Sequence, residues 1–136
     1  MFSRRIYQAS GIEALESSIH GRGVFASKRF AKGETIERAP LIFLTAQERD
    51  WLQTTSLFQY YFLAGDAAIP AAIGLGLSCL YNHNWPANAV YRVFPERAVI
   101  VITAWKAIRP GEEITLNYNG APGDATPVYF PPTTDL

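Results

Sequence analysis

The chain has 136 residues, and its 12 basic and 12 acidic side chains give a formal net charge of zero. This length fits a single domain, and a hydrophobic fraction of 49% indicates a packed globular core rather than a disordered chain. The balanced charge excludes a global field that would drive nonspecific binding to nucleic acid. The sequence has no apolar run of the roughly 18 residues that a membrane span needs, and its N-terminus lacks the apolar run of a signal peptide.

The residue counts also exclude a disulfide framework and a zinc cluster. Cys79 is the only cysteine, and His20 and His83 are the only histidines, so neither an internal disulfide nor a site of several Cys and His ligands can form. We therefore expect no metal site. A reducing compartment is the default, and we expect a soluble protein of the cytoplasm.

Strand patterns dominate the sequence. Short runs rich in Ile, Val, Thr, Phe and Tyr recur between glycine or proline breaks, which is typical of several short strands. The predicted strands are residues 12–18, 23–30, 35–44, 89–94, 98–104 and 113–117. The fold is therefore predicted to be mostly β.

The middle and the end of the chain differ from this pattern. Thr45 and Glu48 have the spacing of a capping box, which predicts a helix of one or two turns. The segment 64–77 is rich in Ala and Gly and contains Pro70, which predicts an irregular connection. The segment 121–136 is a proline-rich tail that can form neither a central strand nor a helix.

Three segments carry residues that a plain β core does not need. Gly21 and Gly23 flank Arg22, so the backbone there can approach a ligand closely, although an ordinary turn explains this segment equally simply. The loop 82–88 holds three side-chain amides and an imidazole, which can bind a polar ligand or satisfy one another in a turn. The strand predicted at 113–117 leads to Tyr118, which alone reads as a core aromatic with its hydroxyl bonded to backbone.

Taken together and in this order, the segments resemble the SET domain family over roughly residues 11–120. The resemblance rests on His-Gly-Arg-Gly-Val-Phe-Ala at 20–26, Lys-Gly-Glu-Thr-Ile-Glu at 32–37, the Asn82-His83 pair, and Gly-Glu-Glu-Ile-Thr-x-x-Tyr at 111–118. The family usually has Asn-His-Ser-x-x-Pro-Asn. Here Asn84 replaces the serine and Pro86 comes one place early, while Asn88 keeps the spacing.

The resemblance implies a fold of several small sheets, like a β-clip, with one or two short helices. In that fold the Asn-His segment and the C-terminal segment cross in a knot-like arrangement. Residues 1–120 would form the domain, and the compact form is more similar to freestanding bacterial or viral members than to animal chromatin enzymes. Because the zinc modules of many family members are absent, the tail 121–136, with Tyr129 and Phe130, is our expectation for the element that closes the active site.

The resemblance also implies a function, that of an S-adenosylmethionine-dependent protein lysine N-methyltransferase. Tyr118 would be the catalytic residue, with its hydroxyl near the point of methyl transfer. The residues expected to bind the cofactor are Gly21, Arg22, Gly23, Val24, Phe25, Asn82, His83 and Tyr118. No base is obligatory, because an apolar channel and a neighbouring sulfonium both lower the pKa of a lysine, which is ordinarily near 10.4. His83 has no carboxylate or nucleophile near it in sequence and is a poor general base.

The implied partner is a lysine-containing protein, and a histone, a ribosomal protein and other basic proteins all stay open, as does the number of methyl groups added. The expected walls of the lysine channel are Tyr60, Tyr61, Tyr81 and Tyr129. We expect no membrane and no direct nucleic-acid partner, and the sequence leaves open a nuclear location or delivery into a host. An apolar face that could support a homodimer comprises Trp51, Leu52, Leu57 and Phe58.

The sequence leaves two alternatives to an enzyme open. One is a binding module of the same fold that holds a peptide or the cofactor without turnover, which would be expected to lose Tyr118 or the Asn82-His83 pair. All three residues are present. The other is a small β-rich interaction protein with purely structural turns, which would leave four matches in register to coincidence.

Overall fold

The computed structural model describes residues 7–63, 67–120 and 122–125, and two β-sheets form the framework of this part of the chain. The larger sheet has the order β5-β6-β4-β9-β8, and β1 also pairs with β4; the smaller sheet has the order β2-β3-β10-β7. The strands of the larger sheet are β1 (Gln8–Ala9), β4 (Thr35–Leu44), β5 (Tyr61–Leu63), β6 (Ala71–Gly74), β8 (Ala89–Phe94) and β9 (Val99–Ala104). Those of the smaller sheet are β2 (Ile12–Glu16), β3 (Arg22–Ala26), β7 (Asn82–His83) and β10 (Glu113–Leu116).

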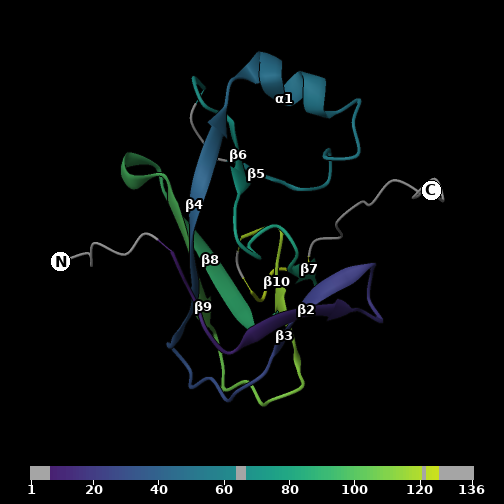
Figure 1. Ribbon diagram of the computed structural model, residues 1–136, viewed down its shortest axis with the longest axis vertical. Helices are drawn as coiled ribbons and strands as arrows, with labels where there is room; N and C mark the ends of the chain where they lie inside the picture. The colour runs from purple at the N-terminus through teal and green to yellow at the C-terminus, as the bar shows by residue number, and fades with distance from the viewer. Residues whose placement is uncertain (1–6, 64–66, 121, 126–136) are drawn as a thin grey trace.

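The helix α1 (Ala46–Leu52) lies beyond the end of β4, at the top of Figure 1, while the smaller sheet lies at the lower right. The capping box predicted from the sequence is confirmed. The Thr45 hydroxyl accepts a hydrogen bond from the Glu48 amide at 3.2 Å, and the Glu48 carboxylate accepts one from the Thr45 amide at 2.9 Å. A short 3-10 turn (Pro95–Arg97) joins β8 to β9. None of the helices in the described residues is long and apolar enough to cross a membrane.

The long strand β4 contains an irregularity that matters for the site. Its register against β9 shifts between Thr35 and Glu37, and the consecutive residues Ile36 and Glu37 are both buried. Residues of a regular strand alternate between faces, whereas a bulge can direct two neighbours inward. A carboxylate is thereby placed inside the protein.

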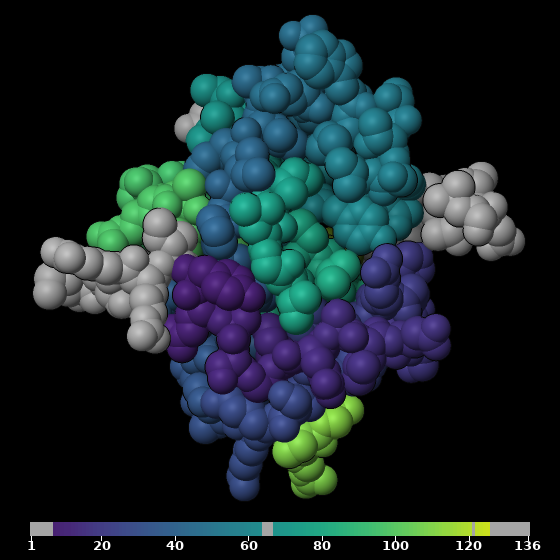
Figure 2. All heavy atoms as spheres, in the orientation of Figure 1, coloured from purple at the N-terminus to yellow at the C-terminus, as the bar shows by residue number. Residues whose placement is uncertain are grey.

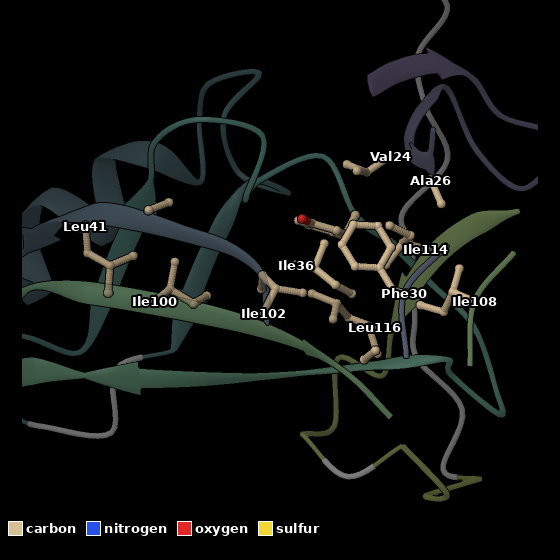
Figure 3. Packing of buried hydrophobic residues seen from close by; sticks show 14 of the residues in the cluster. Val24, Ala26, Phe30, Ile36, Leu41, Ile100, Ile102, Ile108, Ile114 and Leu116 are labelled. Carbon is tan, nitrogen blue, oxygen red and sulfur yellow. The ribbon is translucent and has the colours of Figure 1, made fainter. Parts of the chain in front are cut away.

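One core joins the two sheets, as Figure 3 shows. Phe30 lies near its centre, and Phe30 pairs with Ile108 through an isolated bridge outside the named strands. The larger sheet contributes Ile36, Leu41, Ile100 and Ile102, and the smaller sheet contributes Val24, Ala26, Ile114 and Leu116. The β-branched and aromatic residues that marked strands in the sequence are therefore also the residues that pack the sheets together.

The predicted strands are confirmed within a few residues, and those at 35–44 and 89–94 have the observed bounds. The predicted irregular connection over 64–77 is wrong in part, because β6 pairs there with β4 on one side and β5 on the other. Ala71, Ala72 and Gly74 are buried in this strand. The small side chains leave room for neighbouring residues, since a side chain at Gly74 would collide with Ser78 and crowd Phe62. The segment therefore lacks the bulky residues by which strands are recognised.

The loop after β7 is hydrogen-bonded to the C-terminal segment at several points. The Asn84 amide donates to the Leu116 carbonyl at 3.1 Å, and the Ala87 amide donates to the Pro122 carbonyl at 3.2 Å. The Asn88 side chain takes the place of a strand neighbour: its Nδ2 donates to the Glu113 carbonyl at 2.8 Å, and its Oδ1 accepts from the Thr115 amide at 2.8 Å. The loop thus fixes where β10 runs.

Asn88→Ala should lower the free energy of unfolding by about 2 to 3 kcal/mol, because it leaves the buried Thr115 amide and the Glu113 carbonyl without partners. Urea denaturation measures this difference. The matched control is Asn84→Ala, an exposed change in the same loop that should stay within about 0.5 kcal/mol. Equal losses for the two variants would contradict the bracing role of Asn88.

Candidate functional site

Two cavities of different character meet beside the Asn82-His83 strand. The first, here called the polar cavity, has a volume of about 270 Å³. It is lined by Ile19, His20, Gly21, Arg22, Gln59, Tyr60, Cys79, Leu80, Tyr81, Asn82, His83 and Tyr118. The second, here called the aromatic cavity, has a volume of about 400 Å³. It is lined by Gln59, Tyr60, Tyr61, Phe62, Leu63, Ser78, Cys79, Tyr81, Tyr91 and Tyr118.

The wall between the cavities comes from segments far apart in the sequence. Residues common to both are Gln59, Tyr60, Cys79, Tyr81 and Tyr118. Figure 2 shows the segment 70–80, in teal, between the N-terminal hairpin below it and the segment 46–60 above it. The last residues of that segment lead into β7, so the paired strands β7 and β10 bring Tyr81 and Tyr118 together.

The Tyr118 hydroxyl has a fixed position in this wall. It donates to the Tyr81 carbonyl at 2.6 Å, although 38% of the residue as a whole is exposed. Burial of the hydroxyl raises the pKa of Tyr118 to about 12, and the neighbouring Tyr60 and Cys79 act in the same direction. The phenol therefore stays protonated at neutral pH and is a hydroxyl rather than a base.

His83 supports Tyr118 from the other side. Its Nδ1 accepts a hydrogen bond from the Tyr118 amide at 3.0 Å, and the two rings are 5.2 Å apart. An imidazole that accepts at Nδ1 must be unprotonated there, and burial lowers the pKa of His83, which favours the same neutral form. The imidazole thus holds the chain at Tyr118.

Asn82 is held by the N-terminal hairpin and by β10 together. Its Nδ2 donates to the carbonyls of His20 at 2.9 Å and Arg22 at 3.2 Å, and to the Glu113 carboxylate at 2.9 Å. The other Glu113 oxygen accepts from the Ser17 hydroxyl at 2.6 Å. The two hydrogens of Nδ2 are shared among these three acceptors, and among the described residues no donor bonds to Oδ1 of Asn82.

The predicted cofactor residues divide into two groups. Gly21, Arg22, Asn82, His83 and Tyr118 all line the polar cavity. Gly23, Val24 and Phe25 lie in β3 and line neither cavity: Val24 belongs to the core, and a side chain at Gly23 would collide with Glu113 and crowd Asn82.

The predicted channel tyrosines also divide. Tyr60, Tyr61 and Tyr81 all line the aromatic cavity. Tyr60 is exposed and Tyr61 is half-buried, whereas Tyr81 is only 2% exposed and its hydroxyl donates to Glu37. Tyr129 and Phe130 lie outside the described residues.

Sequence reasoning missed Phe62 and Tyr91, whose rings are 5.4 Å apart and line the aromatic cavity. Strand alternation could have identified Tyr91, because it lies two residues after the buried Ala89 and shares its face. Glu113 belongs to the motif at 111–118, but its role as a hydrogen-bond acceptor for Ser17 and Asn82 has no signal in the local sequence.

Two further features bear on what the site can hold. Among residues 7–63, 67–120 and 122–125, no group of three or more His, Cys, Asp and Glu side chains could hold a metal ion. A wider groove of about 860 Å³ is formed largely by residues 53–60 and shares His20, Arg22 and Tyr60 with the polar cavity. The polar cavity therefore adjoins space for a larger ligand.

The SET domain family model matches residues 21–119, more than half of the chain, and the chain belongs to the SET domain family. Among solved structures it is similar to the crystal structure of a candidate histone methyltransferase from Plasmodium falciparum. The two share 27% sequence identity with a TM-score of 0.65, over 82% of this chain and 94% of that one. No curated protein matches the chain. The mostly β fold of small sheets expected from the resemblance is confirmed.

Lowering the pH from about 7 to about 5 should reduce the stability that depends on His83. Its pKa is lowered in the folded protein, so below the usual value near 6.5 the unfolded chain takes up the proton first. The contribution of the neutral imidazole is therefore present above about pH 6.5 and lost as the pH falls. Urea denaturation at several pH values, with His83→Gln as the comparison, isolates this contribution. Equal pH dependence in the two proteins would contradict it.

Proposed function

We propose that the chain is an S-adenosylmethionine-dependent protein lysine N-methyltransferase with Tyr118 at its reaction centre. One observation carries the proposal: Tyr118 lines both the polar cavity and the aromatic cavity, and its hydroxyl is bonded to Tyr81, which also lines both. A transfer between two bound molecules needs the reacting atoms to meet from two sides, and alignment of this kind can supply several kcal/mol of barrier reduction. The family and the named class of the Plasmodium neighbour support the same reaction.

The polar cavity fits the methyl donor. When bound, S-adenosylmethionine supplies a methyl group on a sulfonium, which is displaced in line without a metal. Gly21 and Arg22 present backbone groups at the cavity, and Oδ1 of Asn82 is an acceptor suited to an ammonium group.

The aromatic cavity fits a lysine side chain. The rings of Tyr60, Tyr61, Phe62 and Tyr91 can pack on its methylenes and on a cationic or methylated amine. No carboxylate is among the described residues that line this cavity. An ammonium group entering it therefore loses water without gaining a counter-charge, and this favours the neutral amine that the reaction needs.

Tyr118 then acts as a hydroxyl that orients. Its pKa of about 12 keeps the proton on the oxygen, and that proton forms the hydrogen bond to the Tyr81 carbonyl. In the proposed reaction the lone pairs of the oxygen interact with the amine and with the polarised methyl group. The residue thus fixes the direction of approach and takes no proton.

The proposal extends to the substrate class, the oligomeric state and the closure of the site. A histone-like basic protein is the substrate class that the neighbour's name supports. The homodimer stays a prediction: of the four apolar residues that suggested it, Trp51 and Leu57 are well exposed and Leu52 and Phe58 are half-buried. Closure of the site by the tail 121–136 likewise stays a prediction.

The test is a radiolabelled methyl-transfer assay on histones and on proteins of a cell lysate. The wild-type protein should label lysine, and Tyr118→Phe should lower kcat by about 100-fold, because the orienting hydroxyl is lost. Trp105→Phe is the control, since Trp105 is exposed and lines neither cavity. Its kcat should stay at the wild-type value.

A thermal shift measurement separates the alternatives. Saturating S-adenosylmethionine should raise the Tm of the wild-type protein, because a ligand that binds only the folded state stabilises it. A raised Tm without labelled lysine would favour a binding module over an enzyme. If neither the Tm nor the label changes, the proposed function is rejected.

A further inference from the structure

Glu37 is a buried carboxylate that the proposed mechanism does not use. Its exposure is 0%, and no arginine or lysine forms an ion pair with it among the described residues. Its Oε1 accepts a hydrogen bond from the Tyr81 hydroxyl at 2.8 Å, and its Oε2 accepts one from the Leu77 amide at 2.9 Å. One side chain of β4 thus binds both ends of the segment 77–81, about 40 residues further along the chain.

The surroundings of this carboxylate are built to fit it. The bulge in β4 directs Glu37 inward beside Ile36, and Gly76 leaves space for Oε2. A side chain at Gly76 would collide with the Glu37 carboxylate and with the ring of Tyr7, and the φ of +63° there also favours glycine. Two separate features of the backbone therefore accommodate one buried acid.

Stability alone gives little reason for an acid at this position. Burial raises the pKa of Glu37, which reflects the cost of removing the carboxylate from water. Buried charged groups can often be replaced by apolar side chains without loss of stability, and their better-attested use is to fix one arrangement among several. The arrangement that Glu37 fixes is the path of residues 77–81.

That path sets the position of the reaction centre. Tyr81 is held at its hydroxyl by Glu37, and its carbonyl accepts the hydroxyl of Tyr118 at 2.6 Å. We propose that Glu37 is a positioning residue, which acts through Tyr81 to fix the carbonyl that orients the Tyr118 hydroxyl. This inference rests on the proposed function, although the hydrogen bonds that link Glu37, Tyr81 and Tyr118 can be tested without any methyl transfer.

The main variant is Glu37→Gln, which keeps the shape of the side chain but offers only one oxygen to two donors, Leu77 and Tyr81. We expect kcat to fall by about tenfold, because a small misplacement of an orienting group is costly, while the Kd for S-adenosylmethionine changes by less than about twofold. In a Tyr118→Phe background the same change should cause no further loss of the residual kcat, since the hydroxyl through which Glu37 acts is already gone.

A structural control separates positioning from general destabilisation. Ile100→Val removes one methylene from the buried core in β9 and should lower the Tm while leaving kcat unchanged. If Glu37→Gln fails to fold, Tyr81→Phe replaces it, because it breaks the same bond from the other side. The proposal is overturned if Glu37→Gln lowers kcat no more than Ile100→Val does at a matched loss of Tm.

The second readout is carbon-13 NMR of the tyrosine Cζ atoms, with the Tyr118 signal assigned by its absence in Tyr118→Phe. Glu37→Gln should shift the signals of Tyr81 and Tyr118 and leave that of Tyr61 in place. The Tyr61 hydroxyl is bonded to Gln53 and takes no part in the hydrogen bonds that link Glu37, Tyr81 and Tyr118. An unmoved Tyr118 signal would overturn the proposal even in an active enzyme. A shifted signal in a protein that transfers no methyl group would support the chain of bonds and reject only the proposed function.

Discussion

The site depends on the pairing of β10 with two strands at once. β10 runs antiparallel to β3 and parallel to β7, and it aligns Thr115 with Asn82 and Leu116 with His83. Two residues of parallel pairing are too few to hold such a register alone. Hydrogen bonds from the surrounding polar side chains also stabilise it. Asn88 bonds to the backbone of β10, and Glu113 bonds to Asn82. The position of β10 therefore determines the position of Tyr118, which lies two residues beyond its end and lines both cavities.

The loop of three asparagines shows that a structural and a functional interpretation of one motif can both hold. The amides of Asn82 and Asn88 are engaged with protein atoms, as expected of a turn that satisfies its own side chains. Those same bonds place Asn82 and His83 at the polar cavity. A polar residue that a ligand will meet must first be fixed, and in a loop this short the fixing bonds have to come from the protein itself.

Much of the fold could be predicted from the sequence, and the failures have physical causes. The strands at 35–44 and 89–94 are rich in β-branched and aromatic residues, and the capping box at Thr45 and Glu48 is a local signal. By contrast, β6 is made of small residues, and β1 and β7 have two residues each, too few to show a period. In the site, motifs indicated Asn82, His83 and Tyr118, but the role of Glu37 depends on contacts with Leu77 and Tyr81, which are distant in the sequence and which no single-chain pattern records.

The position of β5 at the edge of the larger sheet has a consequence for how the protein can change over evolutionary time. β5 pairs only with β6 in this sheet, and the segment before it, 53–60, carries Gln59 and Tyr60 into the wall of the aromatic cavity. The polar cavity takes its backbone contacts and its amide from β3 and β7, in the other sheet. Substitutions at Tyr61, Phe62 and Leu63, which line the aromatic cavity and not the polar cavity, can therefore reshape the first while the second keeps its geometry. The two halves of the site are free to diversify at different rates.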